Sequence, residues 1–179
     1  VNQAQDWTAF RKALSGFAVS SQNMLYADGF GNIGHVMATQ LPARSLVSPT
    51  DIVLQPEDDA HWQRLVGSAD LPVSFNPANG VLASANNRGA EADIPIGYFF
   101  SPDDRVVRLT SSLEANSAVG VAEMAALQQD TYQGSSIVLR DVLLAEIARL
   151  GDKLGLGPRT NRTVNSLRDW DGFYRVDSH

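Results

Sequence analysis

The sequence predicts an α+β fold, with strands in the first half of the chain and helices in the second. Three observations lead to this class. Residues 23–28 and 33–38 are short strand-like runs on either side of a turn. Residues 101–104 combine a serine, a proline and two acids, which is typical of a helix start. Residues 136–150 then carry apolar side chains at helical spacing.

The composition is that of a globular chain. Its 179 residues are 44% hydrophobic and 19% charged, so the chain is long and apolar enough to bury a core without disulfides or bound metals. Cysteine is absent, which excludes disulfides, thiolate nucleophiles and cysteine-ligated metal sites. A net charge of −6 without a basic stripe argues against nucleic acid as a partner. No apolar run approaches the roughly 20 residues of a membrane-spanning helix, so no membrane partner is expected.

The first forty residues predict a helix followed by a hairpin. The helix covers residues 6–17, where Asp6 can cap the start and Gly16 suits the end. Its apolar positions are Trp7, Phe10, Leu14 and Phe17. The two strands flank residues 29–32, a tight connection whose Asp-Gly step tolerates a positive φ.

Residues 40–79 predict a long loop region, because prolines interrupt every candidate element there. Loops of this length inside a domain are often functional. A strand is then predicted over residues 81–86.

The second half predicts three helices. The first has Ser101 as its cap and Pro102 at its first helical position. The second spans residues 121–129, and the third runs from residue 136 until Gly151 ends it. The positions expected to face inward are Val106, Leu109 and Leu113 in the first helix and Leu139, Leu143, Ile147 and Leu150 in the third. Residues 151–179 are polar and glycine-rich and predict no further element.

Several motifs suggest chemistry that their surroundings do not support. Residues 29–34 match G-x-G-x-x-G, but Pro42 stops the following stretch before a crossover helix could form, so a hairpin is favoured over a dinucleotide site. The three histidines, His35, His61 and His179, lack metal-ligand spacing, and no G-x-S-x-G elbow is present. The acids at 57–59 suit a surface turn, and residues 169–172 lack the closing glutamate of a calcium loop.

The pair Asn86 and Asn87 leaves two interpretations open. Adjacent asparagines commonly form turns. Two amides at the end of a strand are costly to bury unless they are hydrogen-bonded, and one of them could instead donate to a developing oxyanion. Composition alone does not choose between these.

Nine short segments follow one another along the chain in an order that is typical of one protein family. They are DWTAFR at 6–11, QNMLYAD at 22–28, GNIG at 31–34, NPANG at 76–80, ANNR at 85–88, DR at 104–105, EMAALQQD at 123–130, WDG at 170–172 and DS at 177–178. Together they resemble the penicillin amidase family of N-terminal nucleophile hydrolases. The resemblance spans nearly the whole chain.

The resemblance implies an αββα sandwich of which this chain holds an incomplete part. Residues 1–179 would be an internal segment of the large (beta) subunit, with no separate second domain. In the family, self-cleavage of a precursor exposes a serine whose hydroxyl attacks an amide carbonyl. The α-amine of the same serine, with an ordinary pKa of about 8, serves as base. Val1 is not such a nucleophile, so the serine is expected outside this chain, and the isolated chain is expected to be an inactive part of an amidohydrolase.

The same resemblance assigns expected roles to residues. Asn86 corresponds to the oxyanion-hole asparagine, and Arg105 to an arginine that orients this amide and the N-terminal amine. Asn87 and Arg88 are supporting candidates. The aromatic residues expected to line an apolar acyl pocket are Tyr98, Phe99 and Phe100. Asp93 is the weak counterpart of an acidic metal ligand.

The implied partners are a small acyl amide, the remainder of the large subunit and the small subunit. Penicillins, cephalosporins and N-acyl homoserine lactones all fit the class, which would connect the parent with antibiotic biosynthesis. No cofactor is expected from this segment, although the full-length protein could bind calcium, and the resemblance suggests a periplasmic location. The alternatives are a non-catalytic binding domain that retains the scaffold and, less favoured, a nucleotide-binding protein.

Overall fold

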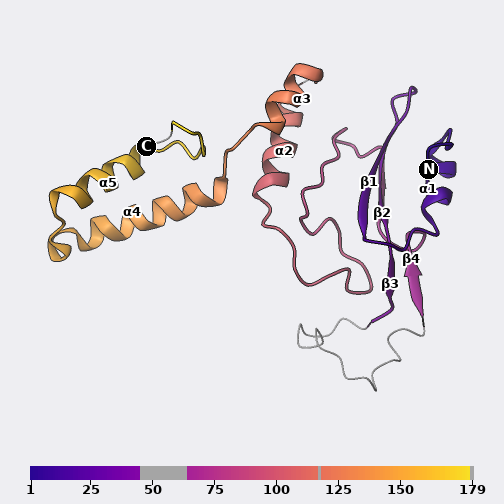
Figure 1. Cartoon of the computed structure of the whole chain (residues 1–179), viewed down its shortest axis with the longest axis horizontal. Coiled ribbons are helices and arrows are strands. Elements are labelled where there is room, and N and C mark those ends of the chain that lie inside the picture. Colours follow the sequence, from indigo (N-terminus) through magenta and orange to yellow (C-terminus); the bar gives the residue numbers. More distant parts are fainter. Residues whose placement is uncertain (45–63, 117, 178–179) are drawn as a thin grey trace. The chain divides into compact units, whose positions relative to one another are not determined.

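The computed structural model describes residues 1–44, 64–116 and 118–177 and divides the chain into two compact units, Val1–Pro102 and Asp103–His179 (Figure 1). In the described residues, every strand lies in the first unit, and four of the helices lie in the second, which confirms the α+β prediction. The acids at 57–59, His61 and His179 lie outside the described residues. That residues 1–179 form one segment without a separate second domain stays a prediction.

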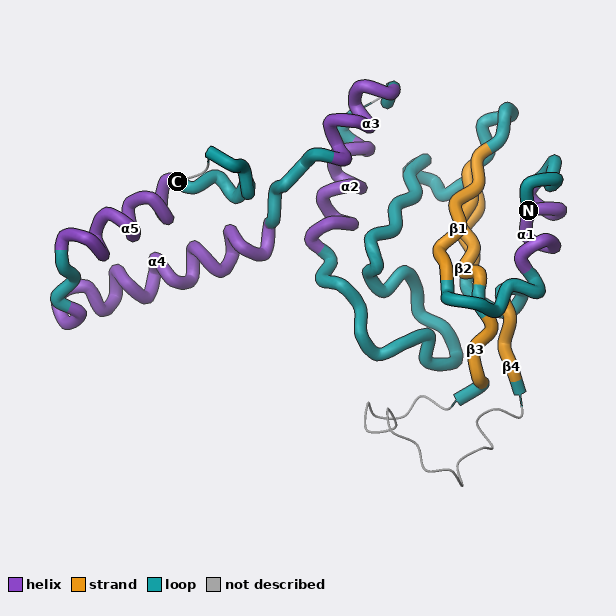
Figure 2. Tube along the Cα trace, in the orientation of Figure 1, coloured by secondary structure: helices purple, strands orange, loops and turns teal. Residues whose placement is uncertain are grey.

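The N-terminal unit begins with the predicted helix and hairpin. Helix α1 (Trp7–Leu14) starts as expected, because Asp6 Oδ1 accepts a hydrogen bond of 2.7 Å from the Ala9 N–H. Strands β1 (Gln22–Ala27) and β2 (Ile33–Ala38) pair antiparallel along their full length (Figure 2). The positive φ of the connection falls on Gly31, at 84°, rather than on the Asp-Gly step.

The prediction that residues 40–79 lack regular elements is wrong. The described part of this range, residues 40–44 and 64–79, contains three short strands: β3 (Gln40–Pro42), β4 (Leu65–Gly67) and β5 (Val73–Phe75). Strand β3 pairs with β4, and β5 pairs with β2 to give a three-stranded sheet in the order β1-β2-β5. The prolines do not prevent this, since Pro42 ends β3 and Pro72 precedes β5.

The strand predicted over residues 81–86 is also absent, because local turn chemistry prevails there. Asn86 has a left-handed backbone with φ of 61°, and the Ala85 N–H donates to the Asn87 side chain at 3.1 Å instead of to a neighbouring strand.

The central strand β2 separates two apolar clusters. Val36 and Ala38 pack with α1 through Phe10 and Leu14. The alternate residue, Met37, packs with residues of the second cluster, as the period of a strand requires. That cluster contains Val66 and Leu71, and it also receives Ile94 and Ile96 from the long segment after β5. The second core thus anchors a segment that has no regular structure of its own.

The C-terminal unit is helical, with corrected boundaries. Its helices are α2 (Asp104–Glu114), α3 (Val121–Gln128), α4 (Gly134–Leu154) and α5 (Pro158–Asp169). The N-cap residue of α2 is Asp103, two residues after the Ser101 predicted for this position, and the Asp103 side chain makes no capping hydrogen bond. Helix α4 continues through Gly151 to Leu154, and its C-cap residue is Gly155, whose φ is 53°. Helix α5 was not predicted, although Gly157 followed by Pro158 is a helix-start signal.

The inward stripes predicted for these helices are only partly buried. In α2, Val106, Leu109 and Leu113 are half-buried. In α4, Leu139 and Leu143 are 59% and 45% exposed, so the prediction that they face inward is wrong within this chain. Of the helices in the described ranges, none is both long enough and apolar enough to cross a bilayer.

Candidate active site

The predicted site residues of the N-terminal unit lie on a loop whose two ends are joined. The Ser101 N–H donates to the Asn86 carbonyl at 2.9 Å, which closes residues 87–100 into a compact loop of the Ω type. Ile94 and Ile96 hold the middle of this loop in the second apolar cluster. The loop residues 87–100 are therefore fixed at both ends and in the middle, although they form no helix or strand.

Asn86 and Asn87 have different environments at the start of this loop. Asn86 is exposed, with a left-handed backbone that asparagine adopts more readily than most residues. Asn87 is half-buried, and its side chain accepts from the Ala85 N–H and donates to the Arg88 carbonyl at 3.2 Å. Asn87 therefore builds the turn that presents Asn86. The turn-forming interpretation describes the backbone of the pair and leaves the amide of Asn86 in an exposed position.

A cavity of about 360 Å³ lies within the closed loop. It is lined by Arg88, Ala90, Glu91, Ala92, Ile94, Pro95, Ile96, Gly97, Tyr98 and Phe100. The Arg88 guanidinium lies 5.1 Å from the centre of the Phe100 ring, which is a cation–π contact. Of the aromatic residues predicted for an acyl pocket, Tyr98 and Phe100 line this cavity, whereas Phe99 is 82% exposed and does not. That the cavity receives an acyl group stays a prediction.

Arg105 belongs to the other unit, in the first turn of α2, and is exposed. Its neighbour Asp104 accepts a hydrogen bond of 2.5 Å from the Ser135 N–H at the start of α4. This bond lowers the pKa of the Asp104 carboxyl, because it stabilises the charged form. Asn86 and Arg105 are thus described in separate units, and the role expected for them together stays a prediction.

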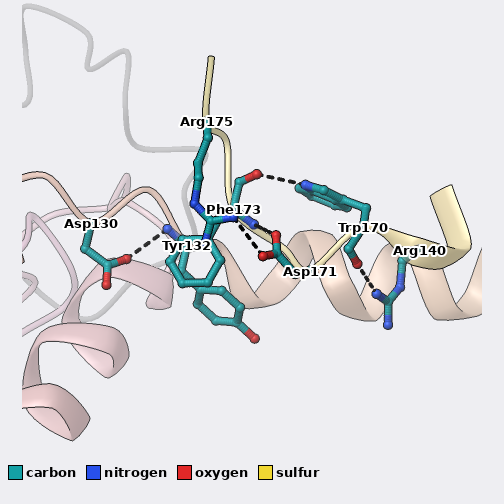
Figure 3. Close-up of polar contacts among 7 residues, drawn as sticks. All are labelled: Asp130, Tyr132, Arg140, Trp170, Asp171, Phe173 and Arg175. Carbon is teal, nitrogen blue, oxygen red and sulfur yellow. Dashed lines mark hydrogen bonds and ion pairs between the residues drawn. The ribbon is translucent and has the colours of Figure 1, made fainter. Parts of the chain in front are cut away.

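Sequence reasoning missed a cluster in the same unit, centred on Asp130. The Arg108 Nε and Nη2 both donate to Asp130 Oδ2, at 3.0 and 2.7 Å. The other carboxylate oxygen accepts from the Tyr132 N–H at 2.9 Å, and the Tyr132 ring lies against that of Phe173 (Figure 3). The pKa of Asp130 is lowered, chiefly by the Arg108 hydrogen bonds. The available signal was that Asp130 ends the segment 123–130 and Arg108 follows Arg105 by one helical turn.

The remaining candidates do not assemble a metal or histidine site in the residues described. His35 is half-buried, and its Nε2 lies 2.9 Å from Asn23 Oδ1 across the hairpin. Burial lowers the pKa of its imidazole. Asp93 is exposed, and the described residues contain no group of three or more acids and histidines that could hold a metal ion. Calcium takes six to eight oxygen ligands, and a role of Asp93 as one of them stays a prediction.

Comparisons with known proteins give one consistent result. A family model described as penicillin amidase matches residues 1–179. The penicillin acylase 2 proenzyme of Pseudomonas sp. (strain SE83) is 27% identical over 169 residues, which cover 93% of this chain and 21% of that protein. A thermostable penicillin G acylase from Alcaligenes faecalis matches in structure with a TM-score of 0.68 and 25% identity, over 95% of this chain and 30% of that one. This chain therefore spans about a fifth of the curated relative.

Proposed function

Because the chain belongs to the penicillin amidase family, we propose that it is an internal segment of the large subunit of an acyl-amide hydrolase. The family match confirms the resemblance found in the sequence motifs. The likeness to a solved penicillin acylase confirms the fold class, a mixed helix and strand part of an N-terminal nucleophile hydrolase.

In the proposed reaction, a serine at the start of the large subunit, outside this chain, attacks the carbonyl carbon of an acyl amide. Its own α-amine takes the hydroxyl proton and returns it to the leaving amine. The carbonyl oxygen becomes an oxyanion, and the Asn86 side-chain NH₂ donates a hydrogen bond to it. Water then releases the acyl group from the serine in the second half of the reaction.

The observation that supports this role is that Asn86 is exposed on a turn whose backbone is held by hydrogen bonds. Its carbonyl is bound by the Ser101 N–H, and its turn is closed by the Asn87 side chain, yet the residue is exposed. A backbone fixed before the reaction limits the directions in which the Asn86 side-chain amide can point. A donor positioned in advance stabilises a developing charge without reorganisation, as an oxyanion hole requires. In this proposal Arg105 orients the amide and the N-terminal amine, and Arg88 supports the loop by stacking on Phe100.

The substrate belongs to the class of linear acyl amides, among which penicillins are the first to test, given the activity named for the relatives. The loop cavity with Tyr98 and Phe100 is a candidate place for the acyl group. The partners would be the rest of the large subunit and the small subunit, since the curated relative is named a proenzyme. A periplasmic location and calcium binding by other parts of the protein belong to the same proposal.

The decisive variant is Asn86→Gly in the full-length protein. Glycine adopts the left-handed backbone of this position without strain, so the variant removes the amide while keeping the turn. Loss of one oxyanion donor is expected to lower kcat by ~10²–10³ with little change in KM. Ser20→Gly is the matched control, because Ser20 is another exposed residue with positive φ, at 44°.

An Asn86→Gly protein with the kcat of the Ser20→Gly control would contradict the oxyanion role. The alternative, a binding domain that retains the scaffold, is tested separately by the coding sequence on either side of this segment. A parent without a serine at the start of its large subunit would be a binding protein.

A further inference from the structure

The helical turn that carries Arg105 is held at two points. Asp104, just before Arg105, accepts from the Ser135 N–H of α4. Arg108, later in the same helix, donates two hydrogen bonds to Asp130. Positions 104 and 108 are four residues apart and lie on one face of a helix. Two attachments on one face, a turn apart, fix the rotation of α2 about its axis and with it the direction in which Arg105 leaves the helix.

The attachment at Arg108 has more contacts than a pair of charges on the surface usually has. The side chains of Arg108 and Asp130 are 37% and 16% exposed. The guanidinium lies 4.9 Å from the centre of the Tyr132 ring and 5.7 Å from that of Phe173. Two donors on one carboxylate and two neighbouring aromatic faces restrict the guanidinium in distance and in plane.

The aromatic part of this cluster is itself held by the C-terminal residues of the unit (Figure 3). The Phe173 N–H donates to Asp171 Oδ1 at 3.1 Å, and the Phe173 carbonyl accepts from Trp170 Nε1 at 2.8 Å. Arg175 lies 4.2 Å from the centre of the same ring and pairs with Asp171 at 2.8 Å. Residues after α5 therefore brace the ion pair that begins on α2.

We propose that Asp130, acting through Arg108, is a positioning residue that sets the orientation of Arg105 for catalysis. This inference rests on the proposed function, in which Arg105 orients the reacting groups. Neither Asp130 nor Arg108 touches substrate in this proposal. A catalytic group displaced by about 1 Å can cost ~10²-fold in rate, so loss of the brace should be visible in kcat.

The chain offers a matched control for this pair. The Arg149 Nε and Nη2 donate to Glu146 Oε2 at 2.9 and 2.7 Å, nearly the same pattern as between Arg108 and Asp130. That pair lies within α4, three residues apart, with its side chains 65% and 54% exposed. Glu146→Gln therefore removes the same kind of ion pair without loosening one helix from another segment.

The experiment measures kcat and KM of the full-length protein with penicillin G and a panel of acyl 4-nitroanilides. Asp130→Asn is expected to lower kcat ~10- to 100-fold with KM changed less than about threefold, whereas Glu146→Gln leaves both unchanged. The same substitution is then made in an Arg105→Ala background. If Asp130 acts through Arg105, it has no further effect there, and this non-additivity distinguishes positioning from general destabilisation.

A folded Asp130→Asn protein with the kcat of the Glu146→Gln control would overturn the inference. So would equal losses of kcat with and without Arg105. Should Asp130→Asn fail to fold, Arg108→Lys decides, because lysine keeps the charge but not the paired donors, and full kcat in that variant overturns the proposal. An Arg105→Ala protein with full kcat would overturn this inference and the role proposed for Arg105, while the role of Asn86 is tested by its own variant.

Discussion

Gly34 in β2 is the position where a single methyl group should disturb the N-terminal core most clearly. A Cβ atom built there would lie 2.3 Å from Trp7 Cζ3 and 2.7 Å from Cη2. The indole cannot easily move aside, because it stacks on Phe75 at 4.9 Å and packs against Tyr26 at 5.4 Å between ring centres. Trp7 is also part of the shell around the cluster of Phe10, Leu14, Val36 and Ala38. The close approach of helix α1 to β2 therefore depends on the missing side chain.

The expected cost of Gly34→Ala follows from two opposing effects. Overpacking typically destabilises by about 1–3 kcal/mol, and a contact this short falls at the upper end. Replacing glycine by alanine within a strand returns about 0.5–1 kcal/mol by reducing the freedom of the unfolded chain. The net expectation is a loss of about 2 kcal/mol in the free energy of unfolding.

Denaturant unfolding followed by tryptophan fluorescence measures this loss. Gly29→Ala is the control in the same hairpin, since a Cβ there would meet nothing within 4 Å, and it should change stability by less than about 0.5 kcal/mol. A second substitution, Trp7→Leu, should remove much of the penalty by clearing the ring. If Gly34→Ala is as stable as the control, or if its cost is unchanged when Trp7 is shortened, the argument from close packing is refuted.

Two further predictions concern the same unit. The pKa of Asp28 is lowered to about 2, mainly because the Asn32 side chain donates a hydrogen bond to the Asp28 carboxylate. The ionised carboxylate therefore stabilises the fold above its ordinary pKa of 3.8, and this stabilisation is lost as the pH falls toward 2. Carboxyl NMR titration measures the pKa, and an Asp28→Asn protein whose stability falls with acid in the same way as that of the unsubstituted protein would contradict the prediction. Asp6→Ala removes the cap of α1 and should cost about 1 kcal/mol in denaturant unfolding; Asp70→Ala, at another exposed acid of the unit, serves as the control, and equal stability of the two variants would show that the cap contributes nothing.

The candidate site was predictable from sequence only as a set of residue types in an order. Asn86 and Arg105 could be named because short motifs around them match a family, and a motif is local information. The sequence predicts Asn86 at the end of a strand, whereas the structure has a turn there. In this turn the Asn87 side chain accepts the hydrogen bond of the Ala85 N–H that a neighbouring strand would otherwise accept. The pair of Arg108 and Asp130 was not predicted, since 22 residues separate the two and neither position is unusual by itself.

The sequence by itself determined the local elements, which depend on side chains close to one another in the chain. The Asp6 cap, the hairpin between β1 and β2 and the existence of α2, α3 and α4 all follow from side chains within a few residues of one another. Strands β3, β4 and β5 depended on tertiary structure, because each has three residues and forms only when a distant partner supplies hydrogen bonds. The closure of the loop after Asn86 and the brace on α2 are decided in the same way, since their energy comes from contacts between segments that are far apart in the chain.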